Sequence, residues 1–324
     1  MNRRIKTVIL GILLILGVSL SVPAQSLPDL KEVQLCVDDF AEGLAKTLPF
    51  NSAMGLNWAD AYIGKFMPSL PPHFGVGGSF GITTMDLPVM ETLMGFFGYS
   101  FPFSISKTIL PVYTAEARIG GFFLPFDVGV KFGYLPPLGL WGTSLNMKYL
   151  LLGADIRYAI LDKPVLPKIS IGVGFNYLSG GVGGKGETRT IAFGSDSITL
   201  DKPDVNLEWD TYSIDFKAQI SKAFLIITPY LGIAGNYAWS SAGYSVDAGV
   251  SWTGDIKEYL KQNGLADMDL SSTGVSSTIK NSAFNARAFG GFSVNLMVFK
   301  LDFTGLYSFR DSNYGASLGA RFQM

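Results

Sequence analysis

The stretch of sequence that decides the fold is KYLLLGADIRYAI-LDKPVLP-KISIGVGFNYL, residues 148–178. Its second half alternates strictly between large apolar residues (Ile169, Ile171, Val173, Phe175, Tyr177) and small or polar ones (Lys168, Ser170, Gly172, Gly174, Asn176). The first half alternates in the same way. Successive side chains of a β-strand point to opposite faces, so each half predicts an amphipathic strand. The prolines within 161–167 cannot continue a ladder, so the whole stretch predicts a β-hairpin.

The two faces of this hairpin differ in composition. One face is aliphatic with tyrosine toward its ends, and the other carries Gly, Ser and Asn with a few charges. Charged residues make up 16% of the chain, against about 25% in soluble domains. Strands of about ten residues with an apolar outer face and a polar inner face are typical of transmembrane β-barrels. The sequence therefore predicts an all-β fold, an antiparallel transmembrane β-barrel.

The same alternation recurs along the chain. The predicted strands cover residues 73–83, 111–121, 126–135, 144–160, 168–179, 206–220, 225–239, 283–296, 299–309 and 313–323. Their connections alternate between short and long, which is typical of outer-membrane barrels with periplasmic turns and external loops. We therefore expect about ten strands. Residues 97–105 and 244–252 also alternate, and either extend strands above the membrane or raise the number to twelve or fourteen.

The chain before the first predicted strand divides into three parts. Residues 1–24 combine a basic start, an apolar run and a Val-Pro-Ala end, and predict a removed secretory signal peptide. Residues 28–48 repeat apolar side chains at helical spacing up to a proline, which predicts an amphipathic helix. Residues 50–72 are rich in large apolar groups that need a packing partner. For 25–72 two arrangements stay open, a helix under the periplasmic end of the barrel (73–324) and a plug inside it.

The predicted inward positions carry charges of both signs. Five strands each supply one acid and one base: Glu116 and Arg118, Asp127 and Lys131, Asp155 and Arg157, Asp215 and Lys217, Lys300 and Asp302. A selective open pore tends to separate the two signs of charge. A balanced set predicts ion pairs packed inside the barrel, because buried charges are costly unless they are paired. We therefore expect a structural core rather than a wide diffusion pore.

The first and last predicted strands have inward columns of glycine and serine. These two strands must pair, because no strand edge can face lipid. Such a seam leaves a trench that a bulky neighbouring segment can fill, although the glycines could also only ease the curvature of the wall. The predicted seam contacts are Trp58, Tyr62 and Phe66 on the N-terminal segment and Gly75, Gly77 and Ser317 on the wall.

The sequence contains little that supports catalysis or metal binding. It has one histidine, His73, and one cysteine. His73 has no Ser or carboxylate partner nearby in sequence, so we expect a structural role rather than general-base catalysis. The stretch GVGGKG (181–186) lacks the Ser/Thr and helix of a phosphate-binding loop. A net charge of −1 argues against nucleic-acid binding. We expect no enzyme, no metal and no cofactor.

The predicted first external loop is too apolar for a loop in water. Large exposed apolar patches usually mark a binding site or a membrane contact, and methionine with phenylalanine makes an adaptable surface. Alternatively, the loop folds into the barrel mouth as core. The predicted ligand-binding residues are Met90, Met94, Phe96, Phe97 and Phe101.

Three segments resemble known barrels. ARIGGFFLPFDVGVKFGYLP (117–136) and KISIGVGFNYLSGG (168–181) resemble uncharacterised outer-membrane barrels of spirochaetes and related bacteria. NSAMGLNWADAYIGKFMPSLPPHFGVGGSFGIT (51–83) is similar in layout to outer-membrane long-chain fatty-acid transporters, with a plug before the first strand. The last strand resembles the C-terminal strand that the barrel-assembly machinery reads, although two residues follow its final aromatic, Phe322.

These resemblances imply a location in the outer membrane, in contact with its lipid. We expect passage or uptake of a small hydrophobic molecule. A structural or surface-interaction barrel without transport is the alternative.

Overall fold

The computed structural model describes residues 30–86, 107–139, 145–163, 165–185, 189–193, 196–253 and 274–324. The predicted signal peptide (1–24), the apolar residues 87–106 and the alternating stretch within them lie outside these ranges. Within the described residues, no helix has both the length and the apolar character needed to cross a membrane.

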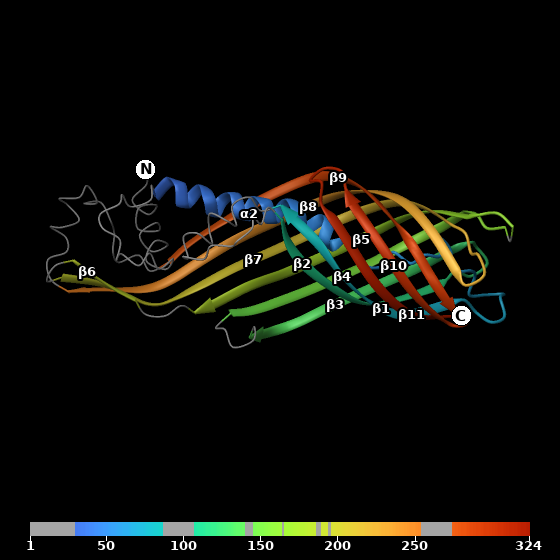
Figure 1. The fold of residues 1–324 in the computed structure, drawn as a ribbon, viewed down its shortest axis with the longest axis horizontal. Coiled ribbons are helices and arrows are strands. Elements are labelled where there is room, and N and C mark those ends of the chain that lie inside the picture. The colour runs from blue at the N-terminus through green and yellow to red at the C-terminus, as the bar shows by residue number, and fades with distance from the viewer. Residues whose placement is uncertain are drawn as a thin grey trace.

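Ten antiparallel strands close into a barrel, as the alternation predicted (Figure 1). The elements are α2 (Leu30–Ser52), β1 (Phe74–Asp86), β2 (Lys107–Gly120), β3 (Phe126–Gly139), β4 (Leu145–Leu161), β5 (Lys168–Lys185), β6 (Arg189–Phe193), β7 (Asp196–Ser221), β8 (Ile227–Thr253), β9 (Gly274–Leu296), β10 (Phe299–Ser308) and β11 (Tyr314–Gln323). Each wall strand pairs with its neighbours in sequence, except that β5 pairs with β7 and β1 with β11. β6 adds only to the far end of β7. The ring is therefore complete with ten strands, without the twelve or fourteen that were the alternative.

The outer and inner faces of the wall follow the predicted parity. Val173 lies between Ile156 of β4 and Phe216 of β7 in the register of the sheet. These three outward side chains are 45%, 49% and 58% exposed, whereas the inward Asp155 and Arg157 are buried. The outer face is thus a belt of apolar side chains that can meet hydrocarbon, and the polar side chains face the lumen.

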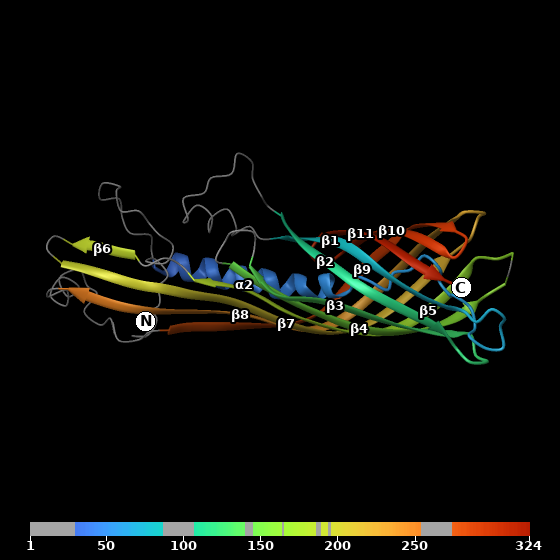
Figure 2. The ribbon, with the colours of Figure 1, turned by 90° about the horizontal axis from the view of Figure 1, so that it is seen from below.

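The two ends of the barrel differ. At one end, here called the short-turn end, short turns join β2 to β3, β4 to β5, β7 to β8 and β9 to β10. At the other, the long-strand end, β7 and β8 reach 26 and 27 residues, against 10 in β10. At roughly 3.3 Å per residue this difference amounts to about 50 Å of strand, and Figure 2 shows β7 and β8 extending toward β6. The alternating stretch 244–252 belongs to β8, so it is a strand extension.

The helix α2 starts toward the long-strand end and runs into the barrel (Figures 1 and 2). Its buried side chains include Ala41, Leu44 and Leu48, and it packs against β7, β8 and β9. A helix under the short-turn end, one of the two expected arrangements, is therefore not what the chain forms.

The helix continues three residues beyond the proline that was expected to end it. Ser52 donates its hydroxyl to the carbonyl of Pro49 at 2.9 Å, and Asn236 of β8 donates to the same carbonyl at 3.3 Å. These two side chains satisfy a carbonyl of the last turn, which has no partner within the helix because the helix ends at Ser52.

Changing one outward residue tests the assignment of faces. We expect Val173→Lys to cost about 2–4 kcal/mol of folding free energy, because a lysine near the middle of the apolar belt must enter hydrocarbon. Val173→Leu is the matched control and should cost little. The measurement is the urea midpoint of the band that resists SDS without heating. Equal midpoints for the two variants would show that this face does not meet lipid.

Gly172→Ser is unsuitable as a control, because a Cβ there would lie 2.8 Å from the Ile156 carbonyl oxygen.

Candidate functional site in the barrel lumen

Residues 53–66, here called the luminal segment, follow α2 through the lumen to the short-turn end. This segment is irregular, so its backbone groups need partners from the wall. The Leu56 amide donates to Glu116 at 2.9 Å, and the Ala61 amide donates to the Ser221 hydroxyl at 2.9 Å. Farther along, the Ile63 amide donates to Asp127 at 3.2 Å. Inward side chains of the barrel thus take the place of a neighbouring strand.

Glu116 of β2 anchors the middle of this segment. Its carboxylate accepts from the Leu56 amide, the Trp58 indole at 2.7 Å, the Ser79 hydroxyl at 2.6 Å and the Thr114 hydroxyl at 2.7 Å. Four donors satisfy the lone pairs of a buried carboxylate. Glu116 therefore positions the luminal segment through hydrogen bonds from both the segment and the wall.

Trp58 lies at the seam between β1 and β11. Its ring stands 4.5 Å from the Arg321 guanidinium, within range of a cation–π contact. A Cβ at Gly75 would lie 2.9 Å from the ring, so glycine leaves the space that the indole occupies. At Gly77 the space is taken by Arg321, whose Cβ would lie 2.5 Å from an added Cβ.

Of the other proposed seam residues, Ser317 lies at the seam as predicted, whereas Tyr62 and Phe66 lie elsewhere. Ser317 lies beside Gly81, and the side chain that fills this end of the seam is Met54. Tyr62 faces another part of the wall, where the Lys168 ammonium is 5.5 Å from its ring. Phe66 packs edge-on against Phe122 in the β2–β3 turn, with ring centroids 5.5 Å apart. Trp58 and Met54 are thus the luminal side chains at the seam.

Toward the short-turn end of the lumen, the inward charges form ion pairs between strands. Arg118 of β2 contacts Asp127 of β3 at 2.5 Å and Asp155 of β4 at 2.7 Å. Asp127 also accepts from Arg157 at 2.9 Å. Asp155 accepts from Lys217 of β7 as well. Adjacent strands are about 4.8 Å apart, whereas same-face neighbours on one strand are nearly 7 Å apart. These four charged groups of β2, β3 and β4 therefore pair across strands, whereas Glu116 and Lys131 bond to uncharged groups.

The network continues around the ring. Asp215 of β7 pairs with Arg287 of β9 at 2.5 Å, and Asp302 of β10 pairs with Arg321 of β11 at 2.6 Å. The side chains of all these charged groups are less than 10% exposed. As expected from their balance, the charges make a packed core.

Asp60 connects the luminal segment to this network, and sequence reasoning missed it. Its carboxylate accepts from Lys300 at 2.7 Å and from Arg321 at 2.9 Å, and Arg157 donates to its carbonyl at 2.8 Å. Two cations on adjacent strands thus hold this carboxylate inside the barrel. The signal that could have found it is the surplus of inward cations on β10 and β11.

Lys131 holds the junction between α2 and the luminal segment. Its ammonium donates to the carbonyls of Ser52 at 2.7 Å and Met54 at 2.5 Å. A cation at these last carbonyls satisfies acceptors that a helix leaves open and complements its dipole. Lys131 thus caps the C-terminus of α2 within the barrel.

Toward the long-strand end, the lumen is apolar. The helix contributes Leu44, Leu48 and Phe50 to a buried cluster. The wall contributes Met85, Tyr149, Leu151, Leu178 and Trp209 to it. A cavity of about 20 Å³ remains beside Trp58, Glu116 and Arg321, which is room for roughly one water. Among the described residues, the half of the lumen toward the long-strand end is therefore packed with apolar side chains, and the half toward the short-turn end is packed with charged ones.

The remaining predicted features occupy the ends or lie outside the described residues. His73 lies at the short-turn end, with its Nδ1 3.2 Å from the Met324 carbonyl oxygen and its ring against Gly64. Gly64 has a φ of 117°, which favours glycine. Among the described residues no three potential ligands cluster as a metal site would require. The predicted ligand residues Met90, Met94, Phe96, Phe97 and Phe101 lie outside the described ranges.

The solved structures to which the chain is similar are outer-membrane β-barrels. No family model and no curated protein matches the chain. Among solved structures, the outer membrane protease OmpT of Escherichia coli aligns with a TM-score of 0.40 and 11% identity, over 82% of this chain and 100% of its own. The attachment invasion locus protein Ail of Yersinia pestis gives 0.28 and 8%, over 78% and 97%. The Ralstonia pickettii toluene transporter TbuX gives 0.25 and 10%, over 78% and 89%. Since these scores are low, the fold assignment rests on the closed strand order.

Proposed function

We propose that this chain is an outer-membrane barrel that is sealed in its resting state and acts at the cell surface. The observation that supports this proposal best is the filled lumen, in which α2 and the luminal segment bond to the wall from the apolar cluster down to Asp60 and Ile63. From this filling by the described residues, we expect no continuous aqueous path for diffusion. The proposal assigns the barrel no catalytic reaction.

The orientation follows from the two ends of the barrel. In outer-membrane barrels the short turns face the periplasm and the longer loops face outward. The long-strand end would then project from the cell, with the extensions of β7, β8 and β9 above the apolar belt. Exposed polar side chains on this extension, such as Glu208, Asp247 and Lys280, suit contact with water or with a partner at the surface.

Two measurements test this proposal. The purified barrel should show no conductance in planar bilayers. In intact cells, a membrane-impermeant maleimide should label Lys280→Cys on the extension of β9 but not Leu225→Cys in the β7–β8 turn, both in a Cys36→Ser background. Both positions are exposed, so exposure alone does not separate them. Labelling of Leu225→Cys alone would reverse the orientation, and steady conductance by the wild type would contradict the sealed state.

A second candidate is passage of a small hydrophobic molecule. The apolar lining of the lumen toward the long-strand end favours it. Withdrawal of α2 would expose Met85, Leu178 and Trp209 as an apolar pocket. In this proposal the apolar loop captures the molecule first, through Met90, Met94, Phe96, Phe97 and Phe101.

The capture step makes a separate prediction. Replacing Met94 and Phe97 with serine should reduce uptake of a radiolabelled fatty acid, because the loop loses apolar contact area. Ile109→Ser, on the exposed outer face of β2, is the control and should leave uptake unchanged. Heat-modifiable gel mobility checks folding. A folded double variant with normal uptake would contradict capture by this loop, and a misfolded one would show that the loop is core.

A further inference from the structure

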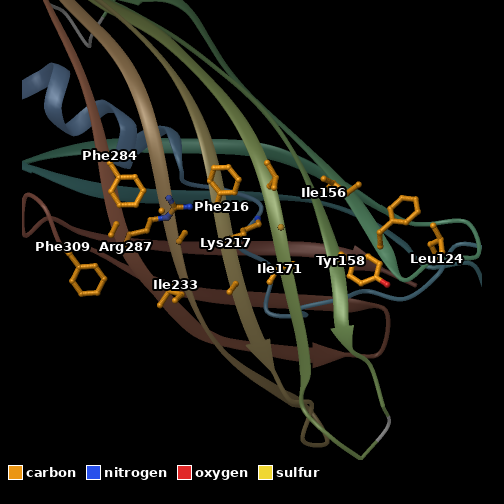
Figure 3. Close-up of a pocket in the computed structure, with 17 residues that line it drawn as sticks. Leu124, Ile156, Tyr158, Ile171, Phe216, Lys217, Ile233, Phe284, Arg287 and Phe309 are labelled. Atoms are coloured by element: carbon orange, nitrogen blue, oxygen red, sulfur yellow. The ribbon is translucent and has the colours of Figure 1, made fainter.

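A hollow of about 920 Å³ lies on the outer face of the wall and crosses β4, β5, β7, β8 and β9 (Figure 3). Six of its lining side chains are Ile156, Tyr158, Ile171, Phe216, Ile233 and Phe284. All six are at least 49% exposed, whereas the inward side chains of the same strands are buried. The hollow therefore opens to the membrane side of the barrel, and atoms of the buried Lys217 and Arg287 also border it.

Small outward residues form the floor of this hollow. Across the sheet, Phe216 is in register with Gly235, and Gly235 with Ala286. One row lower, Ala218 lies between Ile171 and Ile233. The Phe284 ring covers Gly235, where an added Cβ would lie 2.7 Å from it. Ala218 lowers the surface between Ile171 and Ile233, so a long apolar chain can lie close to the backbone there.

Two lysines stand beyond the hollow at the short-turn end. Lys222 continues the outward column of β7 that contains Phe216 and Ala218, and its ammonium donates to the Val165 carbonyl in the β4–β5 turn. Lys163 is exposed in the same turn. The nearby carboxylate, Asp162, pairs with Lys168 at 3.2 Å, so within the described part of the chain no acid neutralises Lys163 or Lys222. These two lysines, here called the rim, lie past the short-turn end of the hollow and do not line it.

We propose that the hollow and its rim form a binding site for an anionic glycerophospholipid. The acyl chains lie over Ala218, beside the Phe284 ring that covers Gly235, and the phosphate lies near Lys163 and Lys222. Basic groups at a membrane surface attract anionic headgroups, and the apolar hollow gains from excluding water and loose lipid. With the short turns in the periplasm, this is a lipid of the inner leaflet.

A second copy of the chain fits the same surface less well. A two-fold axis along the membrane normal would bring identical rims together. Lys163 and Lys222 of one copy would then face the same lysines of the other, and like charges repel at such distances. The charge of the rim thus favours an anionic lipid over a dimer.

Native mass spectrometry tests the site on the full barrel, reconstituted in equal amounts of phosphatidylglycerol and phosphatidylcholine. The wild type should retain one phosphatidylglycerol. Lys163→Gln with Lys222→Gln should reduce the preference for phosphatidylglycerol at least roughly tenfold. Ala218→Phe with Ala286→Phe fills the floor and should abolish retention of both lipids. Ala218→Leu, a smaller change, should weaken retention and gives a second measurement if the double variant does not fold.

Two single-substitution controls make a charge change and a size change of the same kind elsewhere on the barrel. Lys148→Gln removes a lysine outside the rim, and Ala115→Phe adds a ring to the exposed face of β2. Both should retain the lipid as the wild type does. Equal retention of the two lipids by the wild type, or the same loss in the controls, would overturn the proposal. A dimer that Ala218→Leu or Ala218→Phe dissociates would show that a second copy occupies the hollow instead.

Discussion

Asp127→Ala should lower the free energy of unfolding by about 3–5 kcal/mol. The Asp127 side chain is fully buried and accepts from Arg118 at 2.5 Å and from Arg157 at 2.9 Å, and it also accepts the Ile63 amide. Its removal leaves two buried guanidiniums with fewer partners and leaves one backbone donor of the luminal segment unsatisfied. The loss is large because an unpaired buried charge has neither water nor a counter-ion to stabilise it.

The control for Asp127→Ala removes one partner of a solvent-exposed ion pair whose N···O distance equals that of Arg118 and Asp127. Lys148 and Glu208 are 2.5 Å apart, but their side chains are 50% and 63% exposed. Glu208→Ala should therefore cost less than about 1 kcal/mol. Urea titrations of the refolded barrels, followed by tryptophan fluorescence, compare the two. Similar shifts in the two midpoints would mean that burial does not control the strength of these pairs.

The sequence predicted the wall because its signal is local and repeated. Each strand shows its own alternation, and a strand such as 168–178 needs no other part of the chain to assign its outer face. Strand ends were less certain where β7 and β8 leave the membrane. The stretch 244–252 alternates as the wall strands do, so its pattern alone did not distinguish an extension of one strand from an additional strand.

For the lumen, the sequence predicted that the inward charges form ion pairs, but not which residues pair. The balance of inward charges indicated ion pairs, yet each pairing depends on the register between strands. Asp60 lies in an irregular segment without periodicity, so no pattern linked it to Lys300 and Arg321. For the same reason Tyr62 was expected at the seam, where the chain places Met54.

The direction of α2 could not be predicted from its amphipathic pattern, because a helix at either end of the barrel would bury one apolar stripe. The structure resolves this through the wall: the apolar side chains that the helix needs lie on the long-strand half of the lumen, and the charges lie on the other half. The order of the chain then brings the polar residues of the luminal segment to the charged half.

We expect Asp60→Lys to open the barrel to ions. The substitution replaces the carboxylate that holds Lys300 at 2.7 Å and Arg321 at 2.9 Å with a third cation. Attraction between the luminal segment and β10 and β11 becomes repulsion, and removing one partner of a buried pair is strongly destabilising. The segment should leave its place, and water should enter the half of the lumen toward the short-turn end. Planar bilayers should then show a steady current that the wild type lacks.

Asp162→Lys is the matched control, because it makes the same change of charge in the β4–β5 turn, where Asp162 pairs with Lys168 at 3.2 Å on the exposed surface. This variant should stay silent in bilayers. Ala59→Cys in a Cys36→Ser background reports on the segment directly, since Ala59 is fully buried. It should react with maleimide in the folded Asp60→Lys barrel and remain protected with Asp60 in place. A folded Asp60→Lys barrel that conducts no current and protects this cysteine would show that the ion pairs of Asp60 do not hold the lumen closed.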